Sequence, residues 1–168
     1  MSNKKYEHWN DKYHDDNGTE HSKIEELAGK IYDELEKYLL EDIEKVLTED
    51  FKNEPSVKKN HILRRFYRLM DNVEAMRGAA INANSIYALY ACDYQFRREM
   101  WLKARGLCFE INAQLNSIAN ITVEGTNIEK YTRLAGETYQ LAGMIKNNMV
   151  SDDNKKKKHC KPYENIEN

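Results

Sequence analysis

The segment IYALYACDYQFRREMWLKARGLCFEINAQLNSIAN, residues 86–120, contains the pattern that decides the fold class of this chain. Its large apolar residues recur about every 3.5 positions, which is the period of a helix that buries one side. These residues are Ile86, Leu89, Phe96, Met100, Leu107, Ile111, Leu115 and Ile118. Others widen the apolar surface, namely Tyr87, Tyr90, Tyr94, Trp101, Cys108 and Phe109. A helix that is apolar over so much of its circumference is central or buried at a second interface, so the segment favours self-association.

Three other segments repeat the same period, over residues 22–51, 56–82 and 127–149. Pro55 separates the first from the second, because proline cannot continue a helix. The small polar run GAAINANS, residues 78–85, predicts a break before the third helix, and a continuous helix through it is the alternative. Four amphipathic helices joined by short links predict an all-α fold, an antiparallel four-helix bundle.

The remaining sequence sets the domain limits and the cellular class. We expect a disordered polar leader over residues 1–20, the bundle over 21–150, and a disordered basic polar tail over 151–168. With 7 glycines and 2 prolines in 168 residues, turn residues are too few for an all-β fold. No apolar run approaches the roughly 18 residues of a membrane span. No secretory start is present either, so we expect a cytoplasmic protein without membrane contact.

The residue patterns of enzymes are hard to find in this sequence. Its 3 cysteines and 5 histidines never adopt metal-ligand spacing, which predicts a reduced protein without zinc. Phosphate-binding glycine loops, G-x-S-x-G and His-Glu-x-x-His are missing. Glu110 and Asp93 lie near the apolar side of the third helix, where a buried acid has catalytic potential. A structural pairing with arginine is the stronger interpretation, so we expect a binding protein with no catalytic residue, no cofactor and no metal.

Charge is distributed unevenly along the chain. Residues 1–55 hold 8 Lys and Arg against 16 Asp and Glu, whereas residues 56–168 hold 18 against 12. An acidic front and a basic body are typical of proteins that bind a polyanion, and equally typical of helices that carry many solvated charges.

The candidate nucleic-acid site is a stripe on the third predicted helix. Tyr94, Arg98, Trp101 and Arg105 follow one another at steps of 4, 3 and 4, which places them on one side of a helix. Arginine supplies charge for phosphates, and aromatic rings supply flat surfaces for bases. The alternative is that both rings belong to the core and the arginines solvate its edge. If the second and third helices pack side by side, further cations enlarge the site: Arg64, Arg65, Arg68, Arg97 and Lys103.

A lysine run follows the last predicted helix. These lysines add electrostatic affinity for RNA or DNA without a structure of their own, and they are equally typical of a solubilising tail. They are Lys155, Lys156, Lys157 and Lys158.

Several segments resemble one family of small bacterial helical bundles. Residues 106–115 follow the cadence Gly-x-x-x-Glu-Ile-x-x-Gln-Leu, and LAGMIKNNM, residues 141–149, is similar to the family's last helix. RGAAINAN, residues 77–84, resembles its second helix, and SDDNK, residues 151–155, resembles its basic tail. The family is the four-helix bundle group of the 23S rRNA intervening-sequence proteins. It includes the accessory variability determinant (Avd) of diversity-generating retroelements.

The resemblance implies a function that the residue patterns alone do not give. It implies a homopentameric barrel of four-helix bundles that binds an error-prone reverse transcriptase and its template RNA, and so supports mutagenic copying. The family's basic surface corresponds loosely to Arg64, Arg65, Arg68, Arg97, Arg98 and Arg105. Two other functions fit the helices: a protein adaptor that docks through the aromatic side of the third helix, and a helical small subunit of an RNA-guided complex.

Overall fold

The computed structural model describes most of the predicted bundle. The described residues are 18–48, 55–86, 88, 90–119 and 127–159. The greater part of the predicted leader and the last nine residues of the predicted tail lie outside them.

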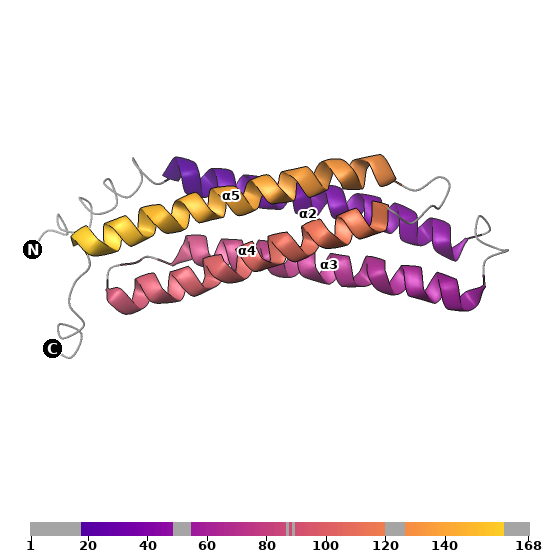
Figure 1. Ribbon diagram of the computed structural model, residues 1–168, viewed down its shortest axis with the longest axis horizontal. Coiled ribbons are helices and arrows are strands. Elements are labelled where there is room, and N and C mark those ends of the chain that lie inside the picture. Colours follow the sequence, from indigo (N-terminus) through magenta and orange to yellow (C-terminus); the bar gives the residue numbers. More distant parts are fainter. Residues whose placement is uncertain (1–17, 49–54, 87, 89, 120–126, 160–168) are drawn as a thin grey trace, which may run out of the picture.

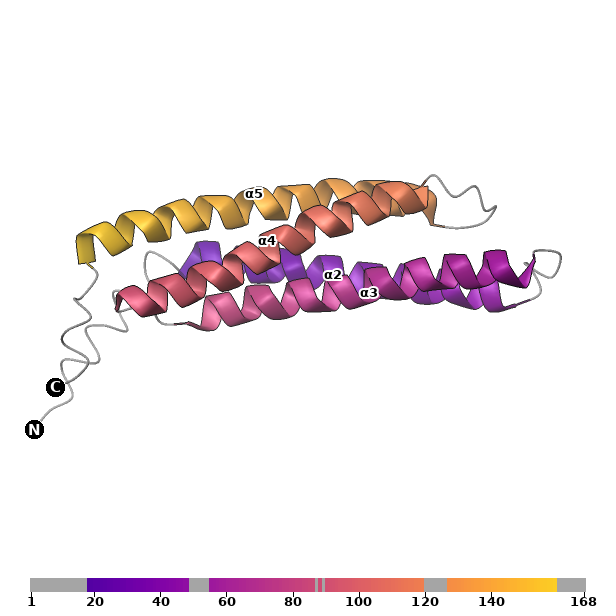
Figure 2. The ribbon, with the colours of Figure 1, turned by 60° about the horizontal axis from the view of Figure 1, so that its bottom comes forward.

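Four long helices make up the described part of the chain: α2 (Gly18–Leu47), α3 (Ser56–Ser85), α4 (Ala91–Ala119) and α5 (Ile128–His159). Each helix packs against two neighbours, so that the order around the bundle is α2, α3, α4, α5 and back to α2. Figure 1 shows the helices lying lengthwise beside one another, and in Figure 2 α5 lies above α2 and α3 while α4 runs obliquely from the level of α3 to that of α5. The predicted all-α antiparallel four-helix bundle is therefore confirmed.

The core residues recur mostly at steps of three and four, which keeps the buried side chains on one side of each helix, and on α4 the two steps alternate strictly. On α4 the buried residues are Tyr94, Arg97, Trp101, Ala104, Cys108, Ile111, Leu115 and Ile118. Fully burying a large aliphatic side chain contributes about 1.5–3 kcal/mol, so these stripes dominate the stability of the bundle. None of the described helices is both long enough and apolar enough to cross a membrane.

The predicted break within residues 78–85 is wrong, because α3 continues through this run and ends at Ser85. Ala79, Ala80 and Ala83 are buried, so the small residues serve close packing of the last turns of α3. The helical path stops after Ser85, whose hydroxyl donates a hydrogen bond to the Asn82 carbonyl at 2.8 Å. Helices α3 and α4 are therefore separate elements.

The start of α4 lies five residues later than predicted, at Ala91. Asp93 accepts a hydrogen bond from the backbone N–H of Tyr90 at 2.9 Å. This is the return half of a capping box, in which an acid at the third helical position bonds the residue before the helix. Asp93 thus has a structural role at the start of the helix.

Helix α5 continues to His159, ten residues beyond its predicted end. The prediction of a disordered tail is therefore wrong for residues 151–159. Asp152 and Asp153 in this extension bond Arg97 and Arg98 of α4, and these contacts hold the extra turns against the bundle.

Candidate nucleic-acid interface

The predicted stripe on α4 is divided between the core and the surface. Trp101 is fully buried and Tyr94 is almost as well covered, because both belong to the series of core positions. Arg98 is exposed and Arg105 is half-buried. The placement of Trp101 gives a base no accessible ring, so the alternative in which the two rings belong to the core holds for this helix.

A neighbouring stripe on α4 is the one that reaches the surface. Arg98, Leu102, Arg105 and Phe109 again follow steps of 4, 3 and 4, turned away from the core. Phe109 is 42% exposed, and Tyr139 of α5, which is 65% exposed, meets it edge-on with ring centroids 6.4 Å apart. The exposed rings at this surface are therefore Phe109 and Tyr139, whereas Tyr94 and Trp101, the rings that the sequence predicted there, are buried.

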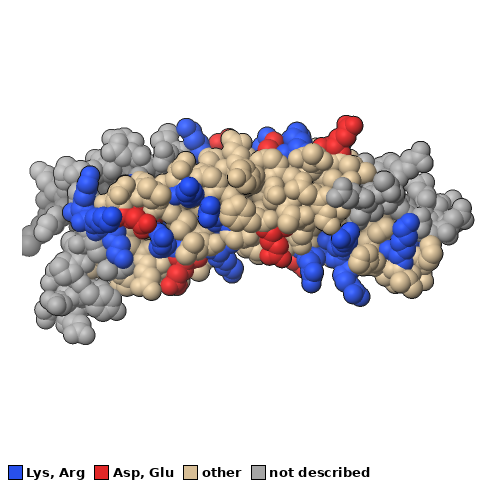
Figure 3. Space-filling model, viewed as in Figure 1, with Lys and Arg blue, Asp and Glu red and all other residues tan. Residues whose placement is uncertain are grey.

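Cations lie beside these rings. The Arg105 guanidinium sits over the Phe109 ring, 4.9 Å from its centroid, which is a cation–π arrangement. Lys146 is exposed and follows Tyr139 by seven residues, so it lies two helical turns along the same side of α5. We call Arg98, Leu102, Arg105, Phe109, Tyr139 and Lys146 the α4–α5 face. Figure 3 views the molecule from the side of α4 and α5, with a broad uncharged area across the middle and cations grouped at the end where α5 finishes.

Arg97 does not contribute to this surface. Its guanidinium is buried and bonds Asp152, with Nε to Oδ2 at 2.8 Å, and it also donates to the Ile86 carbonyl at 3.1 Å. The adjacent Arg98 is exposed and donates through Nη1 to both oxygens of Asp153, at 2.7 and 2.8 Å. A small groove beside it is lined by Tyr94, Gln95, Arg98, Met149, Asp152, Asp153 and Lys156.

The fold does not bring the α3 arginines together with Arg98. Arg65 is half-buried and donates to the Ser117 hydroxyl at 2.9 Å, which places it beside the last turns of α4. Arg98 lies 19 residues earlier on α4, and 1.5 Å per residue separates the two levels by about 28 Å. Arg64 and Arg68 are exposed on α3 at the Arg65 level, so the predicted patch consists of two groups along the bundle.

The lysine run forms the final turns of α5. Lys156, Lys157 and Lys158 are exposed and Lys155 is half-buried. Consecutive residues on a helix point about 100° apart, so the run surrounds the helix end with charge. Lys156 lines the same small groove as Arg98, which places this lysine beside the α4–α5 face.

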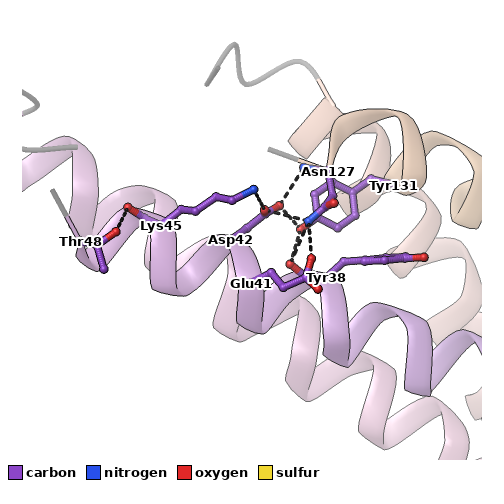
Figure 4. Close-up of polar contacts among 7 residues, drawn as sticks. All are labelled: Tyr38, Glu41, Asp42, Lys45, Thr48, Asn127 and Tyr131. Atoms are coloured by element: carbon purple, nitrogen blue, oxygen red, sulfur yellow. Dashed lines mark hydrogen bonds and ion pairs between the residues drawn. The ribbon is translucent and has the colours of Figure 1, made fainter. Parts of the chain in front are cut away.

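Two acids are buried in the described part of the chain, Asp152 of α5, which pairs with Arg97, and Asp42 of α2, while Glu110 is exposed. Asp42 accepts hydrogen bonds from the Tyr131 hydroxyl, from the Asn127 backbone N–H at 3.2 Å and from Asn127 Nδ2 at 2.9 Å (Figure 4). Lys45 Nζ lies 3.7 Å from it. Because Asn127 directly precedes α5, the carboxylate satisfies an amide at the start of that helix. Burial, and then the hydrogen bond to Asp42, raises the pKa of the Tyr131 phenol, which keeps this donor protonated.

Reactive groups are scarce in the part of the chain that the structure describes. Burial raises the pKa of the Cys108 thiol to about 12, so this cysteine is a packing residue with little thiolate at neutral pH. Within the same part of the chain, no three His, Cys, Asp or Glu side chains gather in a way that suits a metal ion.

Sequence reasoning missed Asp42, Phe109 and Tyr139. Asp42 follows Leu35 and Leu39 at steps of 4 and 3, so its position on the core stripe was a readable signal for a buried acid. The signal for Phe109 was the strict core series on α4, which leaves this residue outside it.

Comparisons with known proteins leave the family open. No protein-family model matches the chain. No match was found among curated proteins or among solved structures.

Proposed function

We propose that this protein is a non-enzymatic accessory factor that binds RNA through the α4–α5 face. The observation that carries the proposal is that exposed Arg98 and Lys146 and half-buried Arg105 lie on one face with the exposed rings of Phe109 and Tyr139. Exposed rings give bases a stacking surface, and cations track the phosphates, which is the common design of sequence-tolerant single-strand binding.

The distribution of charge over the bundle supports this choice of side. Helix α2 holds 9 acidic and 4 basic residues, whereas α3, α4 and α5 together hold 17 basic and 9 acidic residues. A polyanion is repelled by α2 and attracted to the other three helices, of which α4 lies across the bundle from α2. The lysines at the end of α5 extend the cationic surface.

The partner and the assembly come from the family resemblance. Residues 106–115 and 141–149 resemble the Avd group, so we propose a reverse transcriptase as the protein partner and its template RNA as the nucleic acid. In this proposal the protein forms a homo-oligomer, a pentamer in the family's form, and supports mutagenic reverse transcription in a diversity-generating retroelement. It needs no cofactor for this role.

A second candidate is a protein adaptor that uses the same face without nucleic acid. Gly106, Gly136 and Gly143 are exposed in mid-helix, and an added Cβ at each would meet nothing within 4 Å. Glycine in a helix interior costs about 0.5–1 kcal/mol relative to alanine, and nothing within the bundle requires it at these positions. These three glycines would be explained if the backbone of a partner protein approaches α4 and α5 closely at these positions.

Charge reversal separates the two candidates. Arg98→Glu with Arg105→Glu should abolish binding of a labelled structured RNA at moderate salt, measured by fluorescence anisotropy, without changing the helical signal in circular dichroism. The matched control is Lys23→Glu with Lys37→Glu on α2, which changes net charge equally away from the α4–α5 face. RNA binding that survives the first double variant, or that is abolished equally in the control, contradicts the proposal.

Removing residues 155–158 tests the lysine run separately. Without these cations, RNA binding should weaken and log affinity should depend less steeply on log salt. The slope should flatten by about 0.7 for each phosphate of single-stranded RNA that the lysines neutralise. An unchanged slope would assign these lysines to solubility.

A further inference from the structure

The opposite side of the bundle carries a groove between α2 and α3. Its floor is apolar, formed by Leu35, Leu39, Val73 and Met70. Its walls include two tyrosines: Tyr67 is 50% exposed, and Tyr32 is half-buried. Both tyrosines lie on the side of the bundle formed by α2 and α3, which the α4–α5 face does not share.

The rim of this groove is acidic. Glu36, Asp71 and Glu74 line it, and among the described residues none of the three has a cation within ion-pair distance. The charge of Glu36 raises the pKa of the neighbouring Tyr32 phenol, burial and Glu74 add to the effect, and the charge of Arg77 opposes it. The groove therefore combines aromatic walls with three carboxylates that form no ion pair among the described residues.

One cation already uses this environment. The Arg77 guanidinium of α3 lies over the Tyr32 ring, 4.7 Å from its centroid. Arg77 covers one tyrosine, whereas Tyr67 has no cation over its ring among the contacts of the described residues. This contact within the bundle shows that a guanidinium group can pack on a tyrosine ring beside these carboxylates.

We propose that the α2–α3 groove binds a basic segment of a partner protein by taking one Lys or Arg side chain between Tyr67 and the acidic rim. The groove has a volume of about 100 Å³. Pockets for drug-sized ligands are typically about 300–1,000 Å³, so this one suits a single side chain. The apolar floor meets the aliphatic stem, the ring faces the cation, and the three carboxylates supply charge complementarity. A nucleic acid is excluded by the same carboxylates.

The test uses a short acetylated and amidated peptide of alternating leucine and arginine, labelled for fluorescence anisotropy. The control peptide carries citrulline in place of arginine, which keeps the shape and removes the charge. We expect the arginine peptide alone to bind. Tyr67→Leu and Glu74→Gln should each weaken binding about two- to fivefold, the size of an exposed cation–π or ion-pair contact.

The matched control is Glu44→Gln, an exposed acid on α2 outside the groove, which should leave peptide binding unchanged. Equal binding of the citrulline peptide, equal weakening by Glu44→Gln, or no binding of the arginine peptide would overturn the proposal. The RNA affinity of the Tyr67 and Glu74 variants should match wild type, so this result and that of the α4–α5 charge reversal are read independently.

Discussion

Replacing Asp152 with alanine removes the carboxylate that Arg97 meets inside the bundle. The Arg97 side chain is 2% exposed and that of Asp152 9%, so the pair is shielded from water. Removing one partner of a buried pair costs about 3–5 kcal/mol, because the other charge stays in a poorly solvating environment. Arg97 keeps its hydrogen bond to the Ile86 carbonyl at 3.1 Å, so we expect the lower end, about 3 kcal/mol.

The neighbouring residue provides the matched control. Asp153 is 45% exposed and pairs with an Arg98 that is 44% exposed, so Asp153→Ala should cost at most about 1 kcal/mol. Urea unfolding followed by circular dichroism measures both variants. With a slope near 2 kcal/mol per molar urea, the midpoint should fall by about 1.5 M for Asp152→Ala and by less than about 0.5 M for Asp153→Ala.

Two further measurements decide whether the unpaired charge of Arg97 causes the loss of stability in Asp152→Ala. Arg97→Met combined with Asp152→Leu should recover most of the stability, since apolar replacement of a buried pair is often neutral. Hydrogen exchange over residues 150–159 should accelerate in Asp152→Ala, because these turns are held by the pair. Equal costs for Asp152→Ala and Asp153→Ala, within about 0.5 kcal/mol, would refute the reasoning.

Three other changes follow from the packing. Tyr131→Phe removes the hydroxyl that donates a hydrogen bond to the buried Asp42, and it should lower the unfolding free energy by about 1.5–3 kcal/mol in a urea titration. An unchanged urea midpoint would show that this hydrogen bond does not stabilise the protein. Because the pKa of Cys108 is about 12 in the folded protein, its unfolded form loses a proton first, so stability should fall above pH 9 by up to about 1.4 kcal/mol per pH unit. Cys108→Ala should flatten that slope, and an identical slope in the variant would count against the assignment. Gly143→Ala should raise the unfolding free energy by about 0.5–1 kcal/mol in the isolated protein, since its Cβ meets nothing within 4 Å, and a destabilised variant would contradict this.

The number and type of the helices were predictable because each buries a stripe with a local period. The end of α5 was not, because what extends it lies far away in sequence: Asp152 and Asp153 bond residues 55 positions earlier. A polar SDDNKKKK run resembles a solvated tail until the partner arginines are placed beside it. Similarly, the run at residues 78–85 resembles a break until its alanines are seen to be buried.

The sequence predicted the kind of residues in the candidate site, namely arginines and aromatic rings on α4, but not which side of this helix is exposed. Tyr94–Arg98–Trp101–Arg105 and Arg98–Leu102–Arg105–Phe109 share the same spacing of 4, 3 and 4. Spacing says which residues share a side of a helix, while the neighbouring helices decide which side is inside. The placement of α3 and α5 against α4 buries the two rings of the first stripe, Tyr94 and Trp101, and leaves Phe109 of the second at the surface beside Tyr139.

The central claim is that this bundle assembles and takes up RNA. Light-scattering mass in the eluate of a size-exclusion column, with and without a structured RNA at two salt concentrations, tests it most directly. The proposal predicts a stable oligomer that gains the mass of RNA at low salt and releases it at high salt, since phosphate contacts weaken as salt rises. A monomer whose mass is indifferent to RNA at both salt concentrations would contradict it.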